Sequence, residues 1–252
     1  MENIKRTLSE PISEAVKGQI LSDKDLYFLK EKYENYSIIL QIIENLISRD
    51  SEFHFYFNKH YAEEALQYCV NFIRKYPPIN SQPLKITFVG PPCSGKSELV
   101  KCLTQDLHNE YILIDVDYIV NTFKDSKRVT LIYESYNILR RLSGLIAELL
   151  ELYYLQNNSI IVTPKTISNF DWYKTTIEFP EIIICVDADD NTLIKNKHKR
   201  DTNGSQDFLH PEKFEKLKIS SRLSIEKIKE FRHPLIEVIS IFIDSSYNYS
   251  FG

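Results

Sequence analysis

Short runs of apolar residues alternate with helical patterns along the last two thirds of the chain. Five runs are rich in β-branched residues and show no polar alternation, which is typical of strands buried on both faces of a parallel sheet. They are KITFVG at 85–90, YILIDVD at 111–117, SIIVTP at 159–164, EIIICVDAD at 181–189 and IEVISIFID at 236–244. Helical spacing of apolar residues recurs between them, at 97–107, 128–156 and 210–231. The pattern predicts a doubly wound α/β domain with a five-stranded, mainly parallel sheet.

The first 76 residues have a different, helical pattern. Residues 22–48 place apolar side chains at helical spacing after Ser22, which suits a helix N-cap, and residues 60–75 form a second amphipathic segment. The stretch YPPINSQP that follows breaks the pattern with its prolines. We therefore expect a helical N-terminal extension at 1–76, a linker at 77–83 and an α/β domain at 84–252. The extension must bury one face against the sheet, in a dimer interface or against a protein partner.

The segment GPPCSGKS at 90–97 matches the phosphate-loop pattern G-x-x-x-x-G-K-[ST] without a mismatch. Its glycines let backbone N–H groups curl around phosphate oxygens, and the helix that follows directs its N-terminal dipole at the same anion. Lys96 would place its charge on the β- and γ-phosphates, and the Ser97 hydroxyl would bind Mg²⁺. The predicted nucleotide-binding residues are Gly90, Pro91, Pro92, Cys93, Ser94, Gly95, Lys96, Ser97 and Glu98.

A phosphate loop alone does not say what happens to the terminal phosphate. A GTPase switch needs D-x-x-G followed by N-K-x-D. Residues 201–204 match the first pattern, but an Asn-Lys pair precedes them and Lys199 stands where aspartate is needed. A motor ATPase usually has an apolar strand that ends in Asp-Glu, whereas here Asp187 is followed by Ala188. The residues favour transfer to an acceptor.

Two aspartates follow the second predicted strand. Asp115 and Asp117 would lie at the carboxyl edge of the sheet, where open parallel sheets bind their ligands. On an extended segment both side chains would point the same way, one toward an acceptor hydroxyl as its base and the other toward the water shell of Mg²⁺. The catalytic candidates are thus Lys96, Asp115 and Asp117, and the metal candidates are Ser97 and Asp115. A magnesium anchor alone, or a solvated strand end, is the other interpretation of the pair.

A GPPCSGKS loop followed about twenty residues later by a strand ending in D-x-D resembles the P-loop kinases that phosphorylate small hydroxyl or phosphate acceptors. The zeta-toxin-like branch is most similar, with polynucleotide 5′-kinases, adenylylsulfate kinases and nucleotide kinases as relatives, over roughly residues 84–245. The resemblance implies ATP and Mg²⁺ as cofactors, Lys96 and Ser97 as their ligands, and Asp115 or Asp117 as the acceptor-side base. Several of these kinases carry an arginine shortly after the D-x-D, where this chain has only Lys124.

A basic stretch, KNKHKRDTNGSQDF at 195–208, follows the fourth predicted strand. In P-loop kinases this segment forms a lid whose cations close over the phosphates. Arg200 is the preferred catalytic lid residue because a guanidinium binds two phosphate oxygens at once, and Arg222 is the second candidate. A solvated, charged helix end is the alternative. Arg140 could contact an anionic acceptor or lie on the surface, and Trp172 could stack on an acceptor ring or cover the core.

The composition of the chain bears on the class of acceptor, the cell compartment and membrane association. The net charge of −4 predicts no general attraction to nucleic acid or an anionic membrane, so a nucleic-acid 5′ end is less favoured than a nucleoside, nucleotide or sugar nucleotide. The four cysteines form no C-x-x-C pair, which favours a reducing compartment. No segment approaches the about 20 apolar residues that span a bilayer, and the N-terminus has no apolar run.

We therefore expect a cytoplasmic enzyme that moves the γ-phosphoryl group of Mg-ATP to a small-molecule acceptor. A protein delivered into a host cell would have the same sequence features. The alternative function is a nucleotide-binding regulatory ATPase that acts through a protein partner of the N-terminal helices.

Overall fold

The computed structural model describes residues 27, 31–32, 59–105, 110–125, 136–167, 170, 178–202, 211–244 and 249–251. The chain folds into two compact units that do not follow its order. The first unit comprises Met1–Pro77 and Val116–Tyr153, and the second comprises Pro78–Asp115 and Tyr154–Gly252. The second unit holds the sheet and the phosphate loop.

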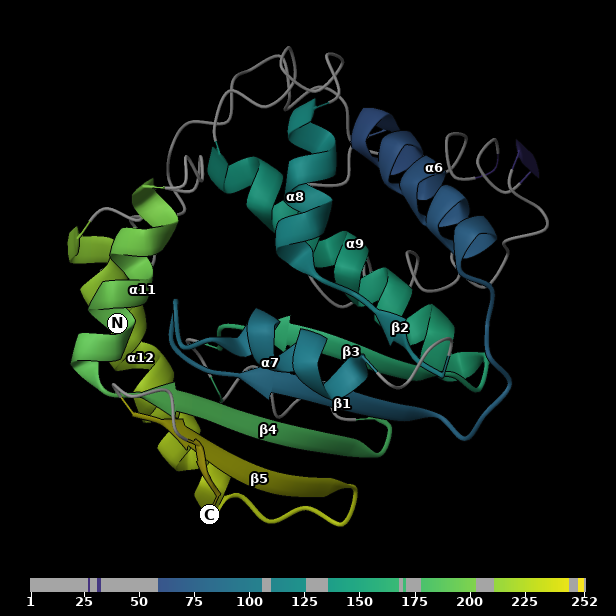
Figure 1. The fold of residues 1–252 in the computed structure, drawn as a ribbon. Coiled ribbons are helices and arrows are strands. Elements are labelled where there is room, and N and C mark those ends of the chain that lie inside the picture. The colour runs from purple at the N-terminus through teal and green to yellow at the C-terminus, as the bar shows by residue number, and fades with distance from the viewer. Residues whose placement is uncertain are drawn as a thin grey trace. The chain divides into compact units, whose positions relative to one another are not determined.

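A six-stranded sheet forms the centre of the second unit (Figure 1). Its strand order is β2-β3-β1-β4-β5-β6, in which β1 to β5 are parallel and β6 runs antiparallel to β5. The strands are β1 (Leu84–Val89), β2 (Ile112–Leu113), β3 (Ile160–Lys165), β4 (Glu181–Ala188), β5 (Ile236–Ile243) and β6 (Tyr249–Phe251). Because five strands are parallel, the segments that follow them all leave the sheet at one edge.

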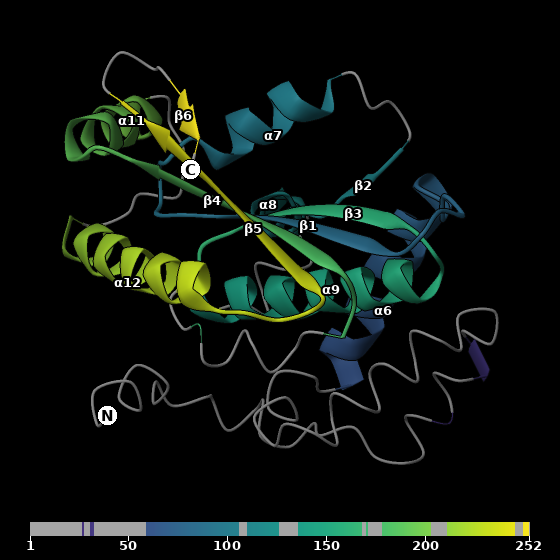
Figure 2. The ribbon, with the colours of Figure 1, turned by 90° about the horizontal axis from the view of Figure 1, so that it is seen from below.

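Helices cover both faces of this sheet (Figure 2). Helix α7 (Lys96–Thr104) lies on one face and α12 (Pro211–Glu230) on the other, while α11 (Asp190–Thr202) follows β4. Side chains that alternate along the strands separate the two layers, as the strand period of two requires. Phe88 and Ile184 belong to the cluster that includes Leu99 of α7, whereas Val89 belongs to the cluster that includes Ile225 of α12.

Helices α6 (Lys59–Lys75), α8 (Val116–Asp125) and most of α9 (Tyr136–Gln156) belong to the first unit. Helix α6 buries Leu66, Cys69 and Ile73, at the spacing that predicts an amphipathic helix. None of the helices in the described part of the chain is long and apolar enough to cross a membrane.

The structure confirms the predicted α/β fold, its five parallel strands and the predicted helices at 60–75, 97–107 and 210–231 over most of their length. The predicted helix at 128–156 is observed from Tyr136 onward. Residues 128–135, Trp172 and nearly all of the predicted helix at 22–48 lie outside the described residues. The sequence did not predict α8, α11 or the antiparallel β6.

One unit boundary falls between Pro77 and Pro78, at the start of the predicted linker. Residues 116–153, however, group with the N-terminal segment and not with the sheet. The division of the chain at 1–76, 77–83 and 84–252 therefore stays a prediction.

Candidate functional site

The phosphate loop begins where β1 passes close to β4. A Cβ atom on Gly90 would lie 2.0 Å from the carbonyl oxygen of Val186 and 2.8 Å from Ser94 Oγ, so only glycine fits this position. The two prolines that follow are buried, and the Ser94 N–H donates to the Pro91 carbonyl over 3.3 Å. Packing and an internal hydrogen bond therefore fix the first half of the loop.

The Lys96 ammonium is held against its own loop. Its Nζ donates to the carbonyl oxygens of Gly90 over 2.9 Å and Pro91 over 2.7 Å, and lies 3.5 Å from Ser94 Oγ. These contacts keep a positive charge at the loop instead of in bulk solvent, which is what binding of an anionic phosphate requires.

Helix α7 begins directly after the loop. Gly95, at its N-cap, has φ of 88°, a left-handed conformation that suits glycine, and its carbonyl accepts the first helical hydrogen bond from Leu99 over 2.9 Å. The amide groups of the first turn therefore face the loop with the positive end of the helix dipole. Ser97 and Glu98 are exposed in this turn, and Glu98 pairs with Lys101 over 3.0 Å.

Helix α11 meets the phosphate loop at Cys93. Asn196 Nδ2 donates to the Cys93 carbonyl over 3.0 Å, and Arg200, one turn further on, contacts the Cys93 thiol. Burial raises the pKa of this thiol, and the charge and hydrogen bond of Arg200 offset part of that rise. The structure thus brings the predicted lid arginine to the phosphate loop, on a helix and not on a loop segment.

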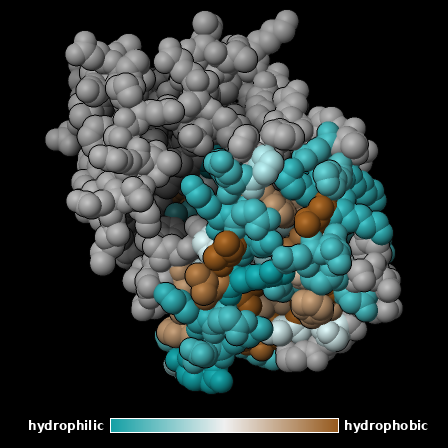
Figure 3. Space-filling view, turned by 90° about the vertical axis from the view of Figure 1, so that its left-hand side faces the viewer, coloured by the Kyte–Doolittle hydropathy of each residue, from teal (hydrophilic) through white to brown (hydrophobic). Residues whose placement is uncertain are grey.

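The basic stretch has two different faces. Lys195, His198 and Lys199 of α11 are exposed, while Asn196 and Arg200 are half-buried. The side of the molecule that carries α11 and α12 is mainly hydrophilic, with apolar side chains in small separate groups (Figure 3). The outer residues thus form a solvated charged surface and the inner ones contact the loop, while a lid over the phosphates stays a prediction.

The two aspartates of the D-x-D segment lie in different surroundings. Asp115 belongs to the unit of the loop and follows Ile114, whose N–H donates to the Val162 carbonyl over 2.9 Å just past β2. Asp117 belongs to the first turn of α8, where the helix dipole favours an acidic residue. Its carboxylate accepts a 2.8 Å hydrogen bond from Arg140 of α9. The prediction that both side chains extend the same way from one strand is therefore wrong, because a helix begins between them.

Arg222, the second lid candidate, is bound to the end of β4. Its Nε donates to both carboxylate oxygens of Asp187 over 3.2 and 3.0 Å, its Nη1 to Asp190 over 2.7 Å and its Nη2 to the Ala188 carbonyl over 2.7 Å. Hydrogen bonds from Arg222 and then Lys218 hold the pKa of Asp190 below its ordinary value. Arg222 therefore joins α12 to β4 and α11, while Arg200 is the lid candidate that contacts the loop.

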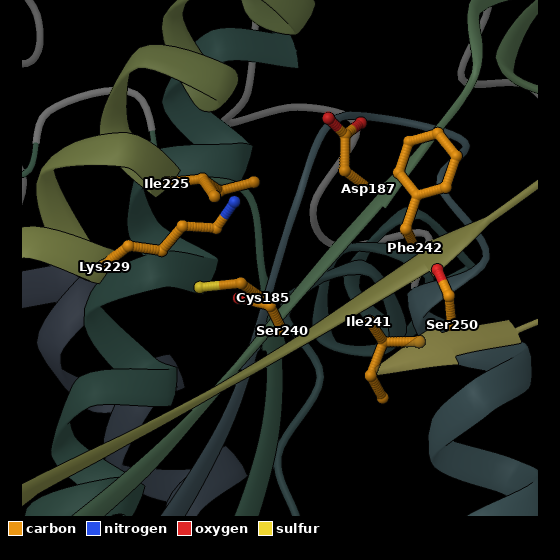
Figure 4. Close-up of a pocket in the computed structure, with 8 residues that line it drawn as sticks. All are labelled: Cys185, Asp187, Ile225, Lys229, Ser240, Ile241, Phe242 and Ser250. Carbon is orange, nitrogen blue, oxygen red and sulfur yellow. The ribbon is translucent and has the colours of Figure 1, made fainter. Parts of the chain in front are cut away.

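A cavity of about 200 Å³ lies beside β4 and β5 on the α12 face (Figure 4). It is lined by Cys185, Asp187, Ile225, Lys229, Ser240, Ile241, Phe242 and Ser250. Both charged side chains have ionic partners, Arg222 for Asp187 and Glu226 for Lys229. Burial raises the pKa of the Cys185 thiol to about 12, so this thiol is neutral near pH 7. The lining contains no residue of the phosphate loop.

Lys165 is a cation next to the start of the phosphate loop that sequence reasoning missed. It ends β3 and pairs in register with Val89, the residue immediately before the phosphate loop, and it is half-buried. A cation that closes a buried strand is a signal of such a site. Pro164 hid that signal, because proline suggested that the strand had already ended.

These residues fit a magnesium nucleotide. The loop combines a backbone without Cβ atoms at Gly90, a helix N-terminus, the Lys96 ammonium and the exposed Ser97 hydroxyl. The described residues contain no group of three His, Cys, Asp or Glu side chains that could hold a metal ion. Mg²⁺ at nucleotide sites usually takes one or two protein ligands together with phosphate oxygens and water, so Ser97 and Asp115 satisfy the chemistry.

A family model described as an AAA domain matches residues 86–220, more than half of the chain. The chain belongs to the AAA domain family. No protein with a curated description matches this AAA domain.

Solved structures are similar to this AAA domain at low sequence identity, and the first one below shares its fold. A chain of the PezAT chromosomal toxin–antitoxin system of Streptococcus pneumoniae has a TM-score of 0.52 and 14% identity, covering 74% of this chain and 80% of its own. A kinase candidate from Chloroflexus aurantiacus J-10-fl has a TM-score of 0.47 and 18% identity, covering 66% and 87%. A chain of the Pnkp1/Rnl/Hen1 RNA repair complex has a TM-score of 0.46 and 21% identity, covering 58% and 46%. At such identities the likeness concerns the fold.

The family match and the shared fold confirm the predicted resemblance. The AAA domain is a P-loop kinase-like domain, and its likeness to the PezAT chain concerns the fold. The roles of its individual side chains are addressed below as proposals.

Proposed function

We propose that the protein transfers the γ-phosphoryl group of Mg-ATP to a hydroxyl or phosphate oxygen of a small acceptor. The observation that carries this proposal is the contact of Arg200 with the phosphate loop at Cys93. It supplies a second cation beside Lys96, as a phosphoryl-transfer transition state requires. A water-activating glutamate, which hydrolysis for mechanical work uses, has no counterpart at the end of β4, where Ala188 follows Asp187.

In the proposed step, the acceptor oxygen forms a bond to the γ-phosphorus while the bond to the β–γ bridging oxygen breaks and ADP leaves. The proton of a hydroxyl acceptor passes to a carboxylate, for which we propose Asp115 because it belongs to the same unit as the loop. Lys96 and Arg200 bind phosphate oxygens and stabilise their charge. Ser97 would help to hold a bound Mg²⁺ ion, which would supply positive charge against the charge of the phosphates.

Asp117 and Arg140 form an ion pair within the other unit. Both side chains are nearly half exposed, 44% for Asp117 and 43% for Arg140, so they present hydrogen-bond acceptors and donors to solvent together. The four cysteines are free thiols, which supports a reducing compartment such as the cytoplasm.

The test is transfer of labelled γ-phosphate from Mg-ATP to pooled nucleosides, nucleotides, sugar nucleotides and oligonucleotides. We expect label on one of these pools, and we expect Lys96→Ala to lower the rate at least about a hundredfold, the scale of a lost transition-state contact. Lys101→Ala, an exposed lysine on the same helix, is the matched control and should keep the rate. ATP binding without label transfer would instead point to the regulatory alternative.

The same assay separates the two aspartates. Asp115→Asn should lower kcat about a hundredfold or more, because a general base contributes that much, while Asp117→Asn should keep kcat because Asp117 belongs to the other unit. A magnesium titration accompanies the Asp115 variant. Recovery of its kcat at high Mg²⁺ would assign Asp115 to the metal, and full kcat in both variants would refute the acceptor-side assignment.

A further inference from the structure

Helix α11 meets the phosphate loop at Cys93. Asn196 and Arg200 stand one helical turn apart on the same face of α11, and both contact Cys93, one at the carbonyl and the other at the thiol. The proposed transfer reaction uses Arg200 but gives Asn196 no task.

The backbone of Cys93 is in a conformation that its side chain disfavours. Its φ is 66°, in the left-handed region, and the other non-glycine residues with positive φ in the described part of the chain, Asn80 and Asn158, are of a type that tolerates it. Cys93 is the third residue of the turn from Pro91 to Ser94, which the Ser94 N–H closes on the Pro91 carbonyl. With proline before it, that position usually takes glycine.

The turn is connected to the phosphate-binding lysine. A peptide unit is planar, so the hydrogen bond that holds the Cys93 carbonyl toward Asn196 also orients the Ser94 N–H toward the Pro91 carbonyl on the other side. That same Pro91 carbonyl accepts the 2.7 Å hydrogen bond from Lys96 Nζ. An unbroken chain of hydrogen bonds thus runs from α11 through the turn to the Lys96 ammonium.

We propose that Asn196 is a positioning residue that holds Cys93 in its left-handed conformation and so keeps the phosphate loop ready for the nucleotide. This inference rests on the proposed function, because it assigns the loop to ATP. If it is correct, the loss of Asn196 weakens nucleotide binding more when the residue at position 93 disfavours positive φ. Glycine at that position adopts the turn without help, whereas alanine resists as cysteine does.

The test combines Asn196→Ala with two substitutions at position 93. We expect Asn196→Ala to weaken Mg-ATP binding about fivefold in the wild-type background, the scale of one lost hydrogen bond, and equally in the Cys93→Ala background. In the Cys93→Gly background the loss should fall below about twofold. The Cys93→Ala background removes the thiol that Arg200 contacts but keeps the backbone strain, so it separates these two contributions. Asn191→Ala, an exposed asparagine on the same helix, is the matched control and should not change binding.

The thermal unfolding midpoint of the nucleotide-free variants gives a second readout. Asn196→Ala should lower it by about 3 °C with cysteine or alanine at position 93 and by less with glycine. Equal losses of binding and of midpoint in all three backgrounds would overturn the inference, and equal losses of binding alone would make Asn196 a direct nucleotide ligand. A wild-type protein that binds no ATP would refute the proposed function, while the midpoints would still decide the role of Asn196.

Discussion

Of the two glycines in the phosphate loop, Gly90 has less space for a side chain than Gly95. A Cβ atom there would lie 2.0 Å from the Val186 carbonyl oxygen and 3.2 Å from its carbonyl carbon, and both atoms belong to the backbone of the neighbouring strand. We expect Gly90→Ala to lower the free energy of unfolding by about 3 kcal/mol, the upper end of the usual cost of overpacking. It should also weaken ATP binding, because the loop must move away from β4. Urea denaturation and nucleotide titration measure the two effects.

Gly144 is the matched control for this substitution. It lies within α9, and a Cβ atom added to it would have no neighbouring atom within 4 Å, so Gly144→Ala places a methyl group in open space. Alanine is the better helix former, and we expect this variant to be stabilised by about 0.5–1 kcal/mol. An unchanged unfolding midpoint and unchanged ATP binding in Gly90→Ala would show that the loop tolerates the displacement of β1 from β4.

At the residue scale, the loop could be predicted from sequence because its pattern is local. The reason why position 90 must be glycine could not be predicted in this way. The carbonyl of Val186 that a side chain would meet is 96 positions away in the chain, and it lies next to Gly90 only because β1 pairs with β4. The D-x-D interpretation failed for the opposite reason. It assumed that an extended strand continues through Asp117, while the α8 helix begins at Val116 and holds Asp117 in its first turn.

At the scale of elements, one arginine joins three of them. The Arg222 guanidinium of α12 contacts Asp187 at the end of β4 and Asp190 at the start of α11. This contact sets where α11 leaves the sheet, and α11 in turn carries Asn196 and Arg200 to the loop. The position of the proposed lid helix therefore depends on a cluster that lies outside the phosphate loop.

We expect Arg222→Lys to lower the free energy of unfolding by about 1–2 kcal/mol, because an ammonium cannot replace a fork of three nitrogens with separate acceptors. The effect is moderate because both side chains of the pair with Asp187 are partly exposed, 33% and 26%. Arg232→Lys is the control, since Arg232 uses one nitrogen for two surface carbonyls and a lysine can do the same.

The difference in the free energy of unfolding between wild type and Arg222→Lys should depend on pH, because Arg222 binds the Asp190 carboxylate. Its pKa is lowered by Arg222 first and by Lys218 second, so its ionised form contributes stability above its ordinary pKa, and that contribution is lost only as the pH falls through the lowered value. The gap between wild type and Arg222→Lys should therefore persist at about pH 5 and shrink toward about pH 3. A gap that does not change with pH would assign the loss to packing of the arginine stem.

The helices differ in how strong a signal they have in the sequence. Helix α12 buries Phe214, Ile225 and Ile228 at helical spacing, and this pattern predicted it. Helix α11 has hardly any apolar residues besides Leu193 and Ile194, and its capping by Asp189 and its contacts with Cys93 depend on the folded sheet. Its basic composition predicted a lid over the phosphates, but not a helix.

At the scale of the whole molecule, the chain leaves the sheet unit after Asp115 and returns to it at Tyr154. The first boundary, at Pro77, carries a clear sequence signal because prolines interrupt the helical pattern there. The segment Val116–Tyr153, which also lies outside the sheet unit, has no such signal at its boundaries. It begins within the D-x-D segment and ends inside α9. Grouping by contact is a property of the folded chain, and it places Asp115 and Asp117 in different units.

Because the phosphate loop belongs to the sheet unit, we expect a bound nucleotide to stabilise that unit more than the other one. A ligand at 100 times its Kd adds about 2.7 kcal/mol to the stability of the state that binds it. If the proposed site is correct, Mg-ATP should raise the unfolding midpoint of the sheet unit by about 5–10 °C. Hydrogen exchange should slow most in the loop at 90–97 and in α11, because Asn196 connects the two, and less in α6 of the other unit.

Two controls test whether this stabilisation comes from the phosphate loop. Removal of Mg²⁺ with a chelator should reduce the shift of the unfolding midpoint, and Lys96→Ala should abolish it. Equal protection of both units, or a shift that survives in Lys96→Ala, would mean that the nucleotide binds somewhere other than the phosphate loop.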